Sequence, residues 1–168
     1  MLDLASKKGI AITAAIAAGI VGASFLVWFV PQSSPGSIIT DVPRTDEEIA
    51  SDVYSRHIDM ASRIDSDFAA WKNGTKTSDE VLGSISSART ETQQLVREIQ
   101  RQPAQEWRQS YDLYEQALDV FGEYLGEVEA AVKGGDNTTA SQQQEIDSLK
   151  AEWQDYVDQS VQAMPASK

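Results

Sequence analysis

Leu95–Tyr114, LVREIQRQPAQEWRQSYDLY, is the stretch that decides the fold, because a proline at position 103 separates two amphipathic helical patterns. Proline lacks a backbone donor and disfavours the helical conformation of the residue before it, here Gln102. A tight turn is therefore predicted, with Pro103 at the first position of the next helix. Positions 99, 103 and 107 stay nearly in phase, so one long kinked helix is the alternative. That helix would have about 55 residues and measure roughly 80 Å, which favours the break.

Amphipathic patterns on both sides of this turn predict four helices. Capping boxes open the first two, at Thr45-Asp-Glu-Glu48 and Thr77-Ser-Asp-Glu80. Apolar residues then recur every three or four positions, which is typical of a helix with one buried face. Short connections join the helices, so the predicted fold class is all-α, an up-down-up-down antiparallel four-helix bundle over 46–164. The predicted helices are 46–72, 78–101, 103–133 and 139–164.

An uncharged apolar run, Gly9–Val30, precedes the bundle and is long enough to span a membrane as a helix of roughly 33 Å. It follows two lysines and ends in bulky residues, Phe25–Val30, where a cleaved signal peptide would have small ones. We therefore predict an uncleaved transmembrane anchor, with a cleaved signal peptide as the alternative. Residues 1–8 would form a cytoplasmic tail and 31–45 a linker rich in proline and serine.

Charge predicts the orientation of this span. Lys7 and Lys8 precede it, whereas mostly acidic residues follow it, so the N-terminus is expected in the cytoplasm and the bundle outside. The localisation predicted is the cell membrane, with a single pass. The whole chain carries a net charge of −12, which argues against nucleic acid as a partner. The chain has no cysteine, which excludes a lipoprotein anchor and disulfides.

The span has a face of small residues spaced four apart, namely Ala11, Ala15, Gly19 and Ala23. Small residues at this spacing let two helix backbones approach closely in lipid. Besides the membrane itself, the expected partner is therefore another transmembrane helix, from a second copy or from a partner subunit. The alternative is that alanine and glycine repeat by chance, because both are common in export signals.

Candidate catalytic and metal-binding residues are scarce. His57 is the only histidine, so a bundle with a di-metal site is not predicted, and no nucleophile elbow or phosphate-binding loop is present. We expect no enzyme activity and no cofactor. His57 is expected to have a structural role at a helix seam or on the surface. The tyrosines and tryptophans at helical spacing are expected in the core rather than in a ligand cleft.

Both asparagines of the chain begin N-glycosylation sequons, Asn73-Gly-Thr75 and Asn137-Thr-Thr139. In the predicted topology their two loops lie at the same, membrane-distal end of the bundle. Asn73 and Asn137 are therefore glycosylation candidates. The alternative is that the two residues only end one helix and start another.

Two segments resemble known proteins. KKGIAITAAIAAGIVGASFLVWFVPQ, residues 7–32, resembles the N-terminal anchors of single-span surface proteins of ammonia-oxidising archaea, a group largely without assigned function. IQRQPAQEWRQSYDLYEQAL, residues 99–118, resembles the helix–Pro–helix turn of exported four-helix domains. The resemblance implies export, archaeal glycosylation and the break at Pro103, and it implies no chemistry.

Two functions are therefore expected from the sequence. The first is a membrane-anchored interaction or scaffolding protein outside the cytoplasm, such as an accessory subunit of a membrane complex. The second is a helical ectodomain that senses a ligand or binds a solute.

Overall fold

The computed structural model describes residues 44–135 and 138–166. They form α2 (Asp46–Lys72), α3 (Ser78–Ile99), the short 3-10 helix η1 (Gln105–Trp107), α4 (Arg108–Gly134) and α5 (Ala140–Gln162). These ranges contain no strand, so the all-helical prediction is confirmed for this part of the chain. None of these helices is long and apolar enough to cross a membrane. The predicted tail, span and nearly all of the linker lie outside the described residues.

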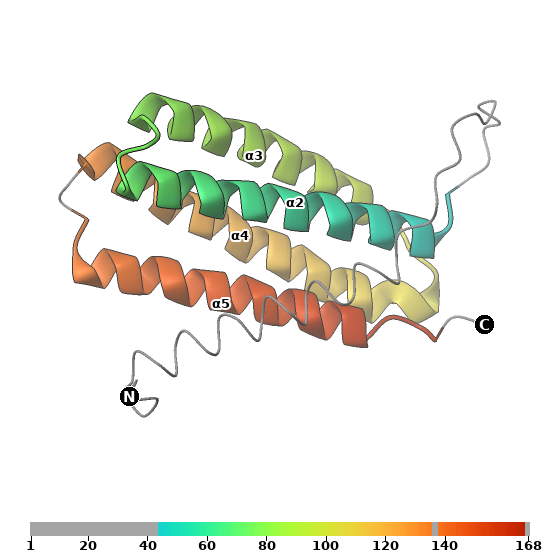
Figure 1. Ribbon diagram of the computed structural model, residues 1–168. Helices are drawn as coiled ribbons and strands as arrows, with labels where there is room; N and C mark the ends of the chain where they lie inside the picture. The colour runs from blue at the N-terminus through green and yellow to red at the C-terminus, as the bar shows by residue number, and fades with distance from the viewer. Residues whose placement is uncertain (1–43, 136–137, 167–168) are drawn as a thin grey trace, which may run out of the picture. The chain divides into compact units, whose positions relative to one another are not determined.

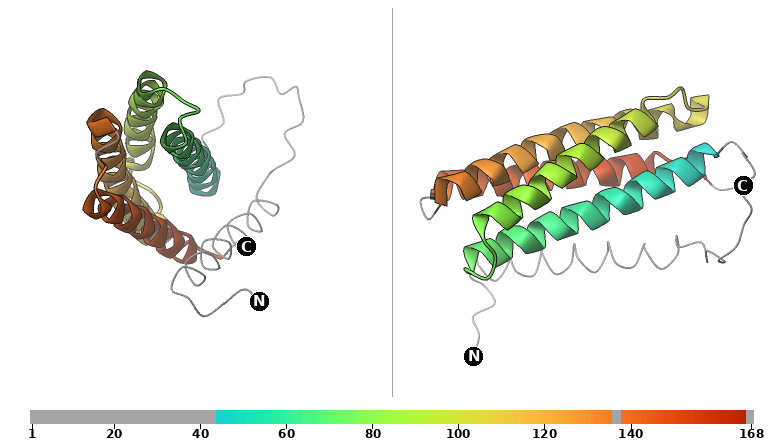
Figure 2. Two further views of the ribbon diagram at one scale, coloured as in Figure 1. Left: turned by 60° about the vertical axis from the view of Figure 1, so that its left-hand side comes forward. Right: turned by 90° about the horizontal axis from the view of Figure 1, so that it is seen from above.

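The four long helices run side by side in alternating directions (Figure 1). Along the chain, each helix packs against the next: α2 on α3, α3 on α4 and α4 on α5. Seen towards their ends, the helices surround a common interior (Figure 2, left). This arrangement defines the described part as a helical bundle.

The predicted capping boxes are present at the starts of α2 and α3. Thr45 Oγ accepts a hydrogen bond from the Glu48 amide at 3.2 Å, and the Glu48 carboxylate accepts one from the Thr45 amide at 2.8 Å. Thr77 and Glu80 repeat this exchange. At the start of α5, Thr139 accepts from the Gln142 amide at 3.1 Å. The local sequence therefore fixes where these three helices begin.

The chain breaks at Pro103, but the prediction that this proline starts the next helix is wrong. Helix α3 ends at Ile99, before the predicted residue 101, and α4 begins only at Arg108, after η1. The reason lies in α2, because Asp46 holds the linker in place: its carboxylate accepts from the Ala104 amide at 2.9 Å and from Arg101 at 3.2 Å. Ala104 is thereby kept extended, with φ −56° and ψ 152°.

The last helix is also slightly shorter than predicted, covering Ala140–Gln162 rather than 139–164. Thr139 is its N-cap, whose backbone is extended, and Ala163 is its C-cap. Helix α2 has the predicted bounds. Only the junction at Pro103 was displaced substantially, because a residue distant in sequence holds it.

Helix α4 supplies the largest share of the core. Its buried residues recur every three or four positions and comprise Ser110, Tyr111, Tyr114, Ala117, Leu118, Phe121, Tyr124, Leu125, Val128, Ala131 and Val132. The apolar core as a whole lies between Ile49 and Val157. The unit Arg44–Lys168 therefore contains the complete core of the described bundle.

Candidate functional site

Polar side chains bridge the seam between α3 and α4 at two heights. Near the end of α3, Gln100 donates to the Glu115 carboxylate at 2.7 Å. From the middle of α3, Arg89 donates to Glu129 of α4 at 2.6 Å. Lys133 also donates to Glu129, and this hydrogen bond, together with the charge of Arg89, lowers the pKa of the Glu129 carboxyl. Glu129 therefore stays charged and accepts hydrogen bonds from both basic side chains.

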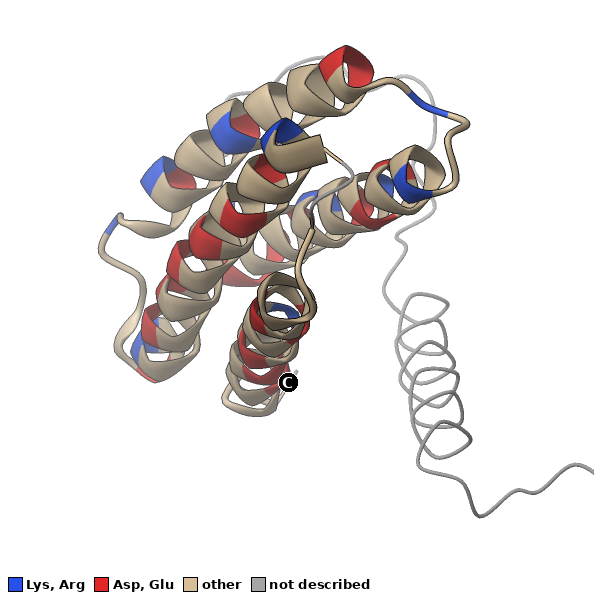
Figure 3. Ribbon diagram, turned by 90° about the vertical axis from the view of Figure 1, so that its left-hand side faces the viewer, with Lys and Arg blue, Asp and Glu red and all other residues tan. Residues whose placement is uncertain are grey.

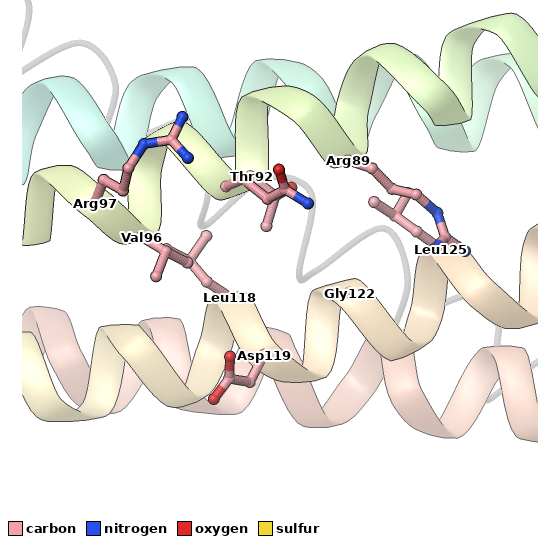
Figure 4. Close-up of a pocket in the computed structure, with 9 residues that line it drawn as sticks. Arg89, Thr92, Val96, Arg97, Leu118, Asp119, Gly122 and Leu125 are labelled. Carbon is pink, nitrogen blue, oxygen red and sulfur yellow. The ribbon is translucent and has the colours of Figure 1, made fainter. Parts of the chain in front are cut away.

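Between these two bridges lies an open groove of about 460 Å³, shown in Figure 4. Its floor is formed by side chains of the bundle core, with Leu118 and Leu125 from α4 and Val96 from α3. The complete lining comprises Arg89, Thr92, Gln93, Val96, Arg97, Leu118, Asp119, Gly122 and Leu125. The groove is thus apolar at its base and polar along both rims.

A glycine in the middle of α4 keeps the groove open. A methyl group added at Gly122 would meet no atom within 4 Å, so the packing of this chain does not require glycine there. At Gly126 an added methyl group would lie 3.7 Å from the Arg89 guanidinium, an ordinary contact. Glycine inside a helix costs about 0.5–1 kcal/mol relative to alanine. The open groove therefore comes at a small cost in helix stability.

The rims of the groove carry opposite charges at the same height. Arg97 lies on the α3 rim and Asp119 on the α4 rim, and their charged groups point away from each other (Figure 4). Neither side chain has an ion-pair or hydrogen-bond partner among the described residues. Acidic residues otherwise predominate along the bundle (Figure 3). An arginine and an aspartate that do not pair with each other therefore flank an apolar floor.

His57, the one histidine considered for chemistry, is fully buried in the core. Its Nδ1 lies 3.1 Å from the Tyr114 hydroxyl, and its ring packs edge-on against Phe121 with centroids 4.6 Å apart. Burial lowers the pKa of His57 to about 3, so the ring is neutral at physiological pH. Within the described residues, no cluster of three or more histidine, cysteine or acidic side chains could hold a metal ion. The position of His57 is that of a core residue.

Most of the tyrosines and one tryptophan have their predicted place in the core. Tyr111, Tyr114, Tyr124 and Trp153 are buried. The hydroxyls reach polar groups, since Tyr124 donates to Asp65 at 2.6 Å and Tyr111 to the Asp46 carbonyl at 3.1 Å. Burial raises the pKa of Tyr124, and the neighbouring carboxylate raises it further. None of these rings lines the α3/α4 groove.

The first predicted sequon lies in the turn after α2. Asn73 is exposed at the C-cap of α2, and Gly74 after it has φ +70°. The Thr75 hydroxyl donates to the Ala70 carbonyl at 3.0 Å. Asn137 lies outside the described residues, but the end of α4 and the start of α5 lie at the same end as the turn from α2 to α3 (Figure 1). The predicted packing face of the span, with Ala11, Ala15, Gly19 and Ala23, also lies outside them.

The architecture thus defines a four-helix bundle with a charged groove between α3 and α4. Comparison with known protein families, curated proteins and solved structures finds no match to this chain. Sequence reasoning missed the groove. The available signal was Gly122-Glu-Tyr-Leu-Gly126, two glycines four residues apart inside a strong helical pattern, where each lowers helix stability.

Proposed function

We propose that the chain is a membrane-anchored, non-enzymatic interaction protein that holds a protein partner outside the cytoplasm. The observation that supports this proposal is the groove between α3 and α4, with its apolar floor and its separate rims of opposite charge. Grooves between helices with an apolar base and polar edges are suited to receive a helix. The anchor comes from the apolar run Gly9–Val30, which would keep the bundle at the membrane surface.

The test uses the absence of cysteine from the chain. A single thiol at Gln93→Cys, on the groove, is labelled with a benzophenone group and irradiated in the native membrane. The matched control is Gln154→Cys, an exposed position on α5. A protein crosslinked from position 93 and not from position 154 supports the proposal. If irradiation at position 93 yields only the monomer, in membranes and after mild solubilisation, the proposal fails.

The proposal also includes association of the anchor with another transmembrane helix. If Ala15 and Gly19 form a packing face, Gly19→Leu places bulk at the contact and weakens association of the span by about 1–2 kcal/mol. Ile16→Leu is the control, because it changes no small residue. A membrane two-hybrid assay with the isolated span measures both. Equal association of both variants and the unchanged span would contradict a packing role for the small residues.

A second candidate function, solute binding, is favoured by the size of the groove. Its volume of about 460 Å³ falls in the range of roughly 300–1,000 Å³ that small-molecule sites occupy. A screen of metabolites by thermal shift on the fragment 44–168 tests it. Stabilisation by a metabolite that is lost in Arg97→Glu would support solute binding, and no stabilisation by any compound would contradict it.

The resemblance to archaeal surface proteins adds a proposal of glycosylation at Asn73 and Asn137. The exposed position of Asn73 at a turn supports accessibility of that sequon. Mass spectrometry of peptides from protein purified out of native membranes tests both sites. Complete recovery of unmodified peptides containing Asn73 and Asn137 would refute the proposal.

A further inference from the structure

We propose that the α3/α4 groove binds a second copy of this chain, through a two-fold axis that runs along the groove parallel to the helices. This inference rests on the proposed interaction function and names the partner. Rotation about such an axis places α3 of one copy opposite α4 of the other. The basic rim of each copy then faces the acidic rim of its partner.

The charges match at a specific height. Arg97 and Asp119 line the same groove from opposite helices, and neither pairs with a described residue. Their charged ends point outward to opposite sides (Figure 4). The proposed axis keeps each residue at its height and exchanges the two sides, so Arg97 of one copy meets Asp119 of the other. Symmetry repeats the pair, and both charges that a single copy leaves unpaired become paired.

The glycines supply room for this contact. Gly122 lies in the groove, and no atom of its own chain approaches the position of a Cβ there. Side chains that are absent from α4 leave its backbone open to a neighbouring helix, as small residues do at close helix–helix contacts. Because the proposed axis places α3 of the second copy opposite α4, the absent side chain at Gly122 lets that α3 approach the α4 backbone.

The size of the face sets the strength of the dimer. Helix α3 has 22 residues, so two neighbouring helices present roughly 600–700 Å². Stable interfaces bury about 800 Å² on each partner, so this one is weak in solution. Anchoring both copies in one membrane raises their effective concentration. We therefore expect the dimer in the membrane and a mostly monomeric fragment in solution.

Charge reversal in the full-length protein in its membrane tests the inference. Each variant carries Gln93→Cys as a reporter, and a short thiol-to-thiol crosslinker measures the dimer fraction. Arg97→Glu turns both attractive pairs into repulsive ones, and Asp119→Arg does the same. We expect each reversal to lower the crosslinked fraction by roughly tenfold. The double variant with both reversals restores the pairs with exchanged signs and is expected within about twofold of the unreversed protein.

Two controls keep the interpretation specific. Lys72→Glu changes the net charge as Arg97→Glu does, but Lys72 lies at the end of α2 and bonds to Gln143 of α5, so the dimer fraction is expected to be unchanged. The series is repeated with Gly19→Leu, which removes the proposed packing of the span. If the charge reversals have no effect, or if the double variant stays as low as the single ones, the inference is overturned.

The outcomes separate this inference from the proposed function. If benzophenone at position 93 captures a different protein while the reversals leave self-crosslinking unchanged, the interaction function stands and the homodimer is overturned. If position 93 captures nothing, both are overturned. Salt titration is a poor substitute, because salt screens the Arg97–Asp119 attraction and the repulsion between two chains of charge −12 at the same time.

Discussion

Helix α4 packs against α5 on one side and against α3 on the other, and small residues occur on both sides. Towards α5 they are buried: Ser160 of α5 donates to the backbone carbonyl of Ser110 at 2.8 Å, and the two hydroxyls lie 3.2 Å apart. Towards α3 the small residues are Gly122 and Gly126, which lie at the partly exposed rim.

The difference shows that the position of a small residue, and not its size alone, decides whether it allows close helix packing or leaves a groove. Where small residues face the core of a neighbouring helix, the two backbones come close and the seam is filled by the helices themselves. Where small residues lie at the rim between two helices that large core side chains already hold apart, they leave a groove. The same helix therefore has one seam that is filled by packing and one that leaves the groove for which we propose a partner.

The largest expected effect comes from adding bulk to the tight seam. Ser110 is 1% exposed, and the void beside it measures only about 10 Å³, too small for a leucine side chain. Ser110→Leu should therefore lower the free energy of unfolding of the fragment 44–168 by about 2–3 kcal/mol through overpacking. Urea unfolding measures this loss.

The matched variant in the open seam is Gly122→Leu. Because no atom lies near its Cβ position, it should leave the free energy of unfolding of the same fragment within about 1 kcal/mol. Equal destabilisation by Ser110→Leu and Gly122→Leu would contradict the contrast between the two seams.

The next effect is a dependence of the free energy of unfolding on pH, caused by the buried residue His57. The pKa of His57 falls from its usual 6.5 to about 3 on folding, so below pH 6.5 only the unfolded chain takes up this proton. Stability is thus fully present above pH 6.5 and falls as the pH drops towards 3. Between pH 6.5 and 5.0 the loss should be about 1.5–2 kcal/mol in urea unfolding.

A variant identifies the group responsible. His57→Leu should flatten the pH dependence over this range, because no other histidine is present. Tyr114→Phe removes the hydroxyl beside the ring but keeps the imidazole, so its slope should persist. The carboxyls of Glu48 and Glu129 have lowered pKa values and titrate below this window, whereas burial raises the pKa of Asp158, so the slope that remains in His57→Leu measures the contribution of carboxyls. If the pH dependence of stability is unchanged in His57→Leu, another titratable group causes it.

A smaller effect is expected at the turn that joins the two helices of the open seam. Asp46 accepts hydrogen bonds from Ala104 and Arg101, which lie between α3 and α4. Asp46→Ala should lower the free energy of unfolding by about 1–2 kcal/mol, on the scale of charged hydrogen bonds. Asp79→Ala is the control, since Asp79 occupies the first turn of α3 and is exposed. If Asp46→Ala and Asp79→Ala lose the same stability, Asp46 contributes only as an acidic residue in the first turn of a helix, and not through its bonds to the turn.

The sequence predicted what depends on neighbouring residues and missed what depends on distant ones. Capping boxes, apolar periodicity and the break at Pro103 follow from contacts within a few residues, and the helices start where Thr45 and Thr77 indicate. The start of α4 at Arg108 depends on Asp46, which is distant in sequence, and no local signal announces it.

The groove was missed for the same reason. Nothing in the pattern of α3 alone or α4 alone shows that Arg97 and Asp119 reach the same height without pairing. The sequence predicted His57 at a helix seam or on the surface, because one histidine without companions offers little chemistry. The structure buries it completely, against Phe121 of α4 and Trp153 of α5, which no pattern within α2 indicates.

The smallest expected effect is that of Gly122→Ala, which should raise the stability of the fragment but weaken partner binding. Gly122→Ala removes a flexible residue from the middle of α4, and its methyl group meets no neighbour, so the isolated fragment 44–168 should gain about 0.5–1 kcal/mol in unfolding free energy. Gly83→Ala on α3 is the matched control, because its methyl group also meets nothing within 4 Å and Gly83 does not line the groove. Both variants should therefore stabilise the fragment in urea unfolding. In the proposed membrane-anchored dimer, only Gly122→Ala should lower the crosslinked fraction from position 93, because only that methyl group enters the groove. A stabilised Gly122→Ala protein that crosslinks as well as Gly83→Ala would show that the partner does not approach the backbone of α4 at this glycine.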